Sequence, residues 1–87
     1  MHEASLMKNL MRQLEDIVKT ENAKRVTGVS VWLGALSRMS AAHFAEHFEE
    51  SSAGTLAEGA EVDVTVSDDP EDANAEQILI RSVTVDT

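Results

Sequence analysis

The chain has 87 residues, a net charge of −9 at neutral pH and no cysteine. That length supports one small domain, and the lack of cysteine excludes disulfides, thiolate nucleophiles and cysteine-ligated zinc. The excess of acidic residues argues against binding to nucleic acid or to an anionic membrane surface. It favours the binding of cations or of partners with a basic face.

The first predicted element is an amphipathic helix over residues 5–22, with Ser5 as its N-cap. Its apolar side chains recur at steps of three and four, which is the spacing of one helix stripe: Met7, Leu10, Met11, Leu14, Ile17 and Val18. A strand from Val26 to Leu33 follows, because β-branched and bulky residues crowd this segment. Gly34 should end the strand or provide a bulge.

The segment "SAAHFAEHFEESSAG" returns to helical spacing and predicts a second helix. Ser40 is its expected N-cap. Phe44 and Phe48 lie four residues apart and therefore share one helix face. Gly54 is expected to mark the end of the helix.

Two strands and an acidic loop complete the chain. Val62, Val64 and Val66 alternate with polar residues, which is typical of a half-buried strand. Residues 67–77, "SDDPEDANAEQ", are acidic and predict an exposed loop. The last strand, "ILIRSVTVDT", shifts its apolar phase at Arg81-Ser82, which predicts a β-bulge there.

The predicted order is therefore α-β-α-β-β over one domain, residues 1–87. The strand–helix–strand unit predicts two parallel strands, and the last two strands should form an antiparallel hairpin. The expected fold is α+β, a small two-layer sandwich with a mixed three-stranded sheet and two helices on one face. No apolar run approaches the roughly 18 residues of a membrane span and no signal-peptide pattern opens the chain, so a cytoplasmic protein is expected.

The start of the chain, Met1-His2-Glu3, offers a possible metal chelate. The Met1 amine, the His2 amide nitrogen and the His2 imidazole can close fused chelate rings around one ion. A nitrogen set of this kind suits square-planar Ni(II) or Cu(II) better than tetrahedral zinc. Glu3 can accept a hydrogen bond that orients the imidazole. From the residues alone, an uninvolved terminal histidine remains the commoner outcome.

The string "HFAEH" is a second candidate, since His43 and His47 are one helical turn apart and Glu46 lies between them. It matches the H-x-x-E-H pattern of one class of zinc proteases. A catalytic zinc site also needs a third ligand and a cleft, which so short a chain hardly supplies. We therefore reject the protease interpretation and leave open a simple metal-binding pair.

Two further segments are interpreted as structural. "GTLAEGAEV" lacks the glycine spacing and the lysine of a phosphate-binding loop, and it predicts a turn before the Val62 strand. The acidic run in residues 67–77 does not have the ligand spacing of an EF-hand calcium loop. A solvated loop is the favoured interpretation.

The strings "MHEASLM", "RVTGVSVWLGALSRMS" and "AGTLAEGAEVDV" follow one another in the order and spacing of the HypA/HybF family. The closing segment "ILIRSVTVDT" is similar to the last strand of that family. The resemblance covers residues 1–66 and 78–87. These proteins are nickel metallochaperones that help to insert nickel into nickel–iron hydrogenase and, in some organisms, urease.

The resemblance implies an α+β nickel-binding domain in which Met1 and His2 bind Ni(II) and Glu3 supports the site. It implies delivery of nickel to maturation proteins or to the enzyme precursor, with no bond-making chemistry. The fourth ligand is left open among water, a partner residue and a second chain, which would make a homodimer. Some family members have an acidic residue at the position of Ser40.

One departure from the family is large. HypA proteins carry a zinc domain with two Cys-x-x-Cys pairs between the last two strands, whereas this chain has only the acidic loop 67–77 there, so no structural zinc is expected. The alternative function is therefore a scaffold or regulatory interaction protein that does not deliver nickel. In that case, the interface would be the helix face that bears Glu46 and Glu50.

Overall fold

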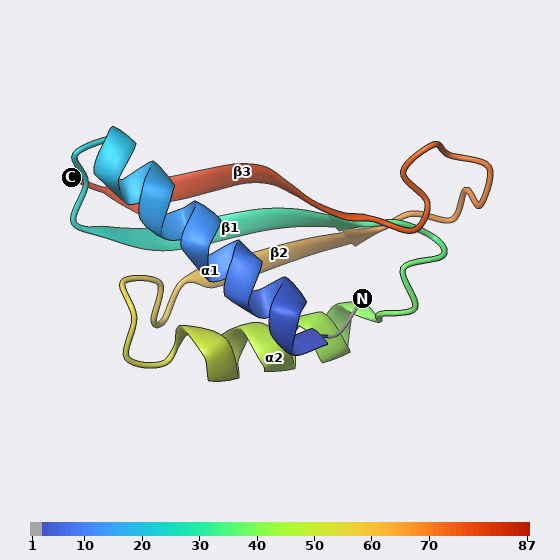
Figure 1. Cartoon of the computed structure of the whole chain (residues 1–87), viewed down its shortest axis with the longest axis horizontal. Coiled ribbons are helices and arrows are strands. Elements are labelled where there is room, and N and C mark those ends of the chain that lie inside the picture. The colour runs from blue at the N-terminus through green and yellow to red at the C-terminus, as the bar shows by residue number, and fades with distance from the viewer. Residues whose placement is uncertain (1–2) are drawn as a thin grey trace.

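The computed structural model describes the backbone of residues 3–87 and the side chains of residues 5–87. Over these residues the chain forms two helices and three strands, in the predicted order (Figure 1). Their bounds are α1 Glu3–Thr20, β1 Arg25–Leu33, α2 Ala41–Ser52, β2 Glu61–Val66 and β3 Ile78–Asp86. None of the described helices is both long enough and apolar enough to cross a membrane.

The strands form a mixed sheet in the order β2-β1-β3. β1 pairs with β2 in parallel and with β3 in antiparallel orientation. The predicted α+β sandwich is confirmed, but the predicted hairpin of the last two strands is wrong, because β2 and β3 lie on opposite sides of β1. Their connection has to span two strand spacings, roughly 10 Å, which an eleven-residue loop does easily.

The loop over residues 67–77 crosses the end of β1 and is tied to it at several points. The Ser67 amide donates to the Leu33 carbonyl at 2.8 Å, and the Gly34 amide donates to the Gln77 carbonyl at 2.8 Å. The loop therefore closes the end of the sheet instead of turning back on β2.

The apolar core lies between the helices and one face of the sheet. Leu14 of α1, Leu33 of β1 and Phe44 of α2 are completely buried. The other buried core side chains are Met7, Leu10, Val18, Val26, Val29, Val31, Phe48 and Ala57. Phe44 and Phe48 stack with ring centroids 6.3 Å apart. The core contains the predicted helix stripes, with Met11 and Ile17 only partly buried at its margin.

The helix ends differ slightly from the prediction. α1 begins two residues earlier than expected, so Ser5 lies inside its first turn and does not cap it. It ends at Thr20, and Asn22 then turns the chain with φ of 52°. Ser40 does cap α2, since its hydroxyl accepts the His43 amide at 3.1 Å. α2 ends at Ser52, and Gly54 follows with φ of 77°.

β3 contains the predicted irregularity. Ser30 pairs with Ser82 but Val31 pairs with Ile80, so Arg81 is the extra residue of a bulge. A second shift in the same pairing, between Val26 and Gly28, was not predicted.

Candidate functional site

The predicted chelate of Met1 and His2 lies outside the described residues, which start with Glu3 at the beginning of α1. The structure locates the helix that follows this chelate. Leu6 of α1 lines a surface hollow of about 750 Å³ together with Met39 and Ile78. Met7 lines a second hollow, of about 450 Å³, with Ser51. The start of α1 therefore lies beside α2 and the segment that precedes it, and Figure 1 shows the first turn of α1 next to the middle of α2.

His43 and His47 occupy this part of α2. Their Nε2 atoms are 2.9 Å apart, which is hydrogen-bonding distance with one ring as the donor. The ring centroids are 4.5 Å apart and the ring planes are inclined at 45°. His43 is exposed and His47 is half-buried. The structure therefore brings together the two imidazoles that the sequence placed one helical turn apart.

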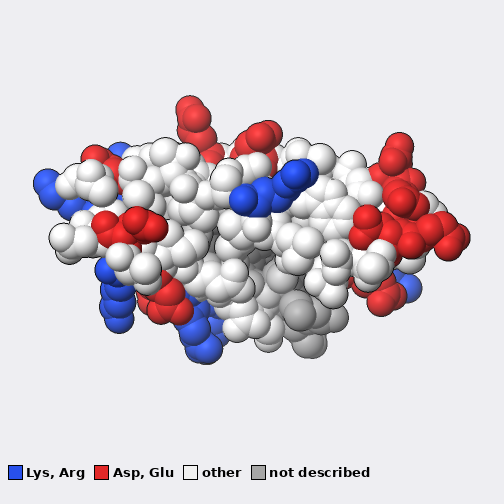
Figure 2. Space-filling view, turned by 90° about the horizontal axis from the view of Figure 1, so that it is seen from above, with Lys and Arg blue, Asp and Glu red and all other residues white. Residues whose placement is uncertain are grey.

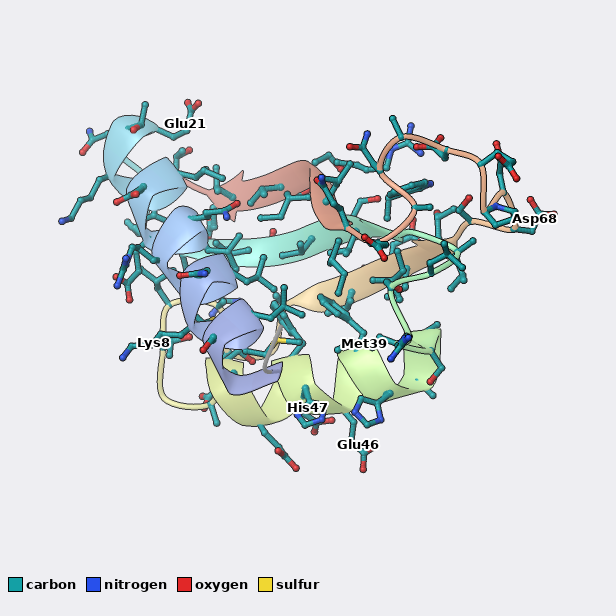
Figure 3. The ribbon with its side chains drawn as sticks, turned by 45° about the vertical axis from the view of Figure 1, so that its right-hand side comes forward. Lys8, Glu21, Met39, Glu46, His47 and Asp68 are labelled. Carbon is teal, nitrogen blue, oxygen red and sulfur yellow. The ribbon has the colours of Figure 1, made fainter. Side chains whose placement is uncertain are left out.

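The geometry gives no support to a zinc hydrolase. In Figure 3 the Glu46 side chain points away from the body of the molecule, whereas a catalytic base has to face the metal ion. Among the described residues, no group of three or more His, Cys, Asp or Glu side chains is arranged to hold a metal.

The string "GTLAEGAEV" forms the predicted turn. The Gly54 amide donates to the Glu58 carboxylate at 2.7 Å, and the Thr55 hydroxyl accepts the Ala57 amide at 3.1 Å. Ala57 is completely buried beneath the turn. The Val26 amide donates to the Leu56 carbonyl at 2.9 Å, which fixes the turn against the start of β1. These residues shape the fold and form no phosphate-binding loop.

The acidic loop is exposed but locally ordered by its own carboxylates. Asp69 Oδ1 accepts the Glu71 amide at 3.0 Å, and Asp72 Oδ1 accepts the Asn74 amide at 2.7 Å. Such bonds are typical of Asx turns. Figure 2 shows the acidic side chains gathered at the end of the molecule that carries this loop. The loop is therefore a negatively charged surface with a structural role for its aspartates.

The sheet face opposite the helices carries partly exposed apolar side chains. Trp32 of β1 pairs across the strands with Leu79 of β3. Together with Arg81 these residues line a shallow cavity of about 250 Å³. The bulge at Arg81 shapes this cavity. Sequence reasoning noted the bulge but not the cavity, because the cavity depends on the pairing of β1 with β3.

The fold is shared with two solved HypA structures. The solution structure of the Ni metallochaperone HypA from Helicobacter pylori matches with a TM-score of 0.80, at 18% identity, over 99% of this chain and 98% of that chain. A second solution structure, of a HypA protein, matches with a TM-score of 0.76 at 18% identity, over 97% of this chain and 95% of that chain. The fold thus defines the chain as an α+β domain of the HypA type.

Sequence comparisons then identify the family. A family model described as hydrogenase/urease nickel incorporation metallochaperone HypA matches residues 1–70. The hydrogenase maturation factor HypA of Aquifex aeolicus is 39% identical over 62 residues, which are 71% of this chain and 54% of that protein. The same factor of Klebsiella pneumoniae is 38% identical over 64 residues, 74% of this chain and 56% of that protein. The chain belongs to the HypA family, and it spans about half the length of the curated relatives it matches.

Proposed function

We propose that this chain binds Ni(II) at its amino terminus and delivers the ion, in the cytoplasm, during maturation of a nickel enzyme such as nickel–iron hydrogenase. The observation that carries the proposal is the family match, which begins at residue 1 and so includes Met1, His2 and Glu3. The role is binding and transfer without bond-making catalysis. The partners are maturation proteins or the enzyme precursor.

The donor set explains the choice of metal. The Met1 amine, the His2 amide nitrogen and the His2 imidazole are three nitrogens in sequence, and nitrogen-rich planar coordination suits Ni(II) and Cu(II). Both the amine and the amide have to lose a proton before they bind, so nickel loading releases protons. Glu3 would orient the imidazole by accepting its remaining N–H. The fourth position is open to water, a partner residue or a second copy of the chain.

The position of α1 supports this proposal. α1 begins at Glu3 and is packed on the core through Met7 and Leu10. A transfer partner would approach the end of the molecule at which this helix begins.

We further propose that the loop over residues 67–77 stands in place of the zinc domain of the family. Its ends join β2 and β3, and its backbone is anchored to Leu33 and Gly34, so the sheet closes without an inserted domain. The chain has no cysteine and needs no zinc for this arrangement. Nickel binding at Met1 and His2 would then work without coupling to a zinc site.

The decisive experiment changes only the terminal amine. Ni(II) is titrated calorimetrically into the protein with a free Met1 amine and into the same protein acetylated at that amine, both with His43→Ala and His47→Ala. The free amine should allow binding of one ion, and the acetylated protein should lose this binding because the amine can no longer donate to the metal. Equal binding by the two proteins, or no binding by either, would rule out the chelate.

A second measurement separates delivery from the alternative, a scaffold that does not deliver nickel. The nickel-loaded protein is mixed with an apo-hydrogenase precursor and its maturation proteins, and nickel in the precursor is counted. The protein with a free Met1 amine should raise nickel incorporation above that produced by the same amount of free Ni(II) with a competing chelator. If the protein acetylated at the Met1 amine stimulates incorporation equally, the scaffold function is the correct one.

A further inference from the structure

We infer that His43 and His47 form a second metal site on α2, a bidentate imidazole pair for Ni(II) or Cu(II). The site is independent of the chelate at Met1 and His2 and does not rest on the proposed delivery function. The pair is held by one rigid helix, whose start is fixed by the Ser40 cap and whose inner face is fixed by the buried Phe44 and Phe48.

The separation of the two nitrogens matches a particular coordination geometry. Imidazole nitrogens bind such ions at about 2.0–2.1 Å. With the Nε2 atoms 2.9 Å apart, an ion at this distance from both would subtend an angle of about 90°. That is the angle between neighbouring ligands in square-planar and octahedral complexes. A tetrahedral ion, with angles of about 109°, would need the nitrogens about 3.3 Å apart.

The rings are therefore already placed for two cis positions of a square-planar or octahedral ion. In the metal-free protein one Nε2 donates a proton to the other. A bound ion takes the place of this proton, and the donating ring changes to its other tautomer, so that each neutral ring carries its single N–H proton on Nδ1. Because the rings already contact each other, little rotamer freedom is lost when the ion binds.

The charge of the surrounding helix favours a cation. α2 contains Glu46, Glu49 and Glu50 and neither lysine nor arginine, and the whole chain has a net charge of −9. A local field of this sign raises the concentration of divalent cations near the helix. The carboxylates need not coordinate the ion. The described residues include no group of three or more His, Cys, Asp or Glu side chains that could hold a metal, so the proposal concerns the two imidazoles alone.

Figure 3 shows His47 on the part of α2 that lies beside the start of α1. An ion held at the pair would therefore lie on the same side of the molecule as the first turn of α1.

A composition-matched swap tests the inference. The background is the protein acetylated at the Met1 amine, in which the amino-terminal chelate cannot form. In the variant His47→Glu with Glu49→His, the histidines at positions 43 and 49 are six residues apart and project from different sides of the helix, while helix charge and composition are unchanged. Circular dichroism and thermal unfolding verify that both proteins fold alike.

Each protein is titrated with Ni(II) and with Cu(II), and the imidazole resonances are followed by NMR. The parent should bind one ion with both histidines shifted together, and the swap should bind at least about tenfold more weakly, because the second imidazole no longer adds to the first. Equal affinities, or shifts at only one histidine of the parent, would overturn the inference. Since the chelate is disabled in both proteins, failure here leaves the amino-terminal site untouched.

Discussion

Ala75, in the loop between β2 and β3, lies so close to Gly34 that no side chain fits at position 34. A β-carbon on Gly34 would be 2.1 Å from the Ala75 carbonyl oxygen and 2.4 Å from its carbonyl carbon. Ala75 is itself 4% exposed, and its carbonyl accepts the Leu36 amide at 2.7 Å. This contact fixes the path of the acidic loop over the end of β1.

Substitution of Gly34 by alanine should therefore be strongly destabilising. The new methyl group meets backbone atoms, which cannot rotate away, so we expect a loss of about 2–3 kcal/mol in the free energy of unfolding. Urea denaturation measures it. Gly28→Ala, within β1, is the matched control, since its β-carbon would be 3.5 Å from Thr84 Cβ, an ordinary contact. Similar losses for the two variants would contradict the role given to Ala75.

The cap of α2 gives a second prediction. Ser40→Ala removes the hydroxyl that accepts the His43 amide, and we expect a loss of about 1 kcal/mol. Ser40→Asp keeps an acceptor and adds a negative charge at the positive end of the helix, so it should unfold at the wild-type temperature or above it. If Ser40→Ala and Ser40→Asp were equally destabilised, the capping bond would not be the cause.

The element order and the apolar stripes were predictable because they depend on local spacing. The burial of Leu14 and Phe44 is indicated by apolar neighbours three and four residues away. The bulge at Arg81 is indicated by a break in the alternation of apolar and polar residues. The step of three residues from Val26 to Val29 is the same kind of break, and it corresponds to the second bulge.

The strand order was not predictable from local spacing. β1 is the partner of both β2 and β3, and an alternating strand has the same pattern whichever neighbour it joins. The meeting of Gly34 with Ala75 depends on that order, as does the cavity at Trp32. In the candidate sites, the proximity of His43 and His47 was predictable, because a single helix sets the distance between them. The surroundings of Leu6 were not predictable, because they come from two segments far from it in the sequence, residues 36–39 and 76–78.

The docking of α1 is tested by a core truncation. Leu14 is completely buried, whereas Leu36 is 48% exposed. Leu14→Ala should lower the free energy of unfolding by about 3 kcal/mol because it leaves a cavity beneath α1. Leu36→Ala removes the same atoms from the surface and should change it by no more than about 0.5 kcal/mol. A small effect of Leu14→Ala would mean that α1 contributes little to the core.

The acidic loop should depend on the oxygens of its aspartates and not on their charge. Asn at positions 69 and 72 keeps an oxygen for the Glu71 and Asn74 amides, so Asp69→Asn with Asp72→Asn should preserve amide protection in residues 67–77. Asp69→Ala with Asp72→Ala loses both bonds and should speed hydrogen exchange there. Calcium should protect none of these proteins. Protection by calcium in the wild type alone would indicate a cation site instead.

Trp32 reports on the open face of the sheet, since it is the only tryptophan of the chain. It pairs with Leu79, which is 36% exposed, while its neighbour Leu33 is completely buried on the opposite face. Leu79→Ala should uncover the indole and shift its emission to longer wavelength, with a stability loss of about 1 kcal/mol or less. Leu33→Ala should lower the free energy of unfolding by about 3 kcal/mol and leave the emission maximum of the folded protein unchanged. If Leu79→Ala left the emission unchanged, the indole would not be shielded by this cross-strand pair. The cavity beside Arg81 would then offer no apolar contact to a partner.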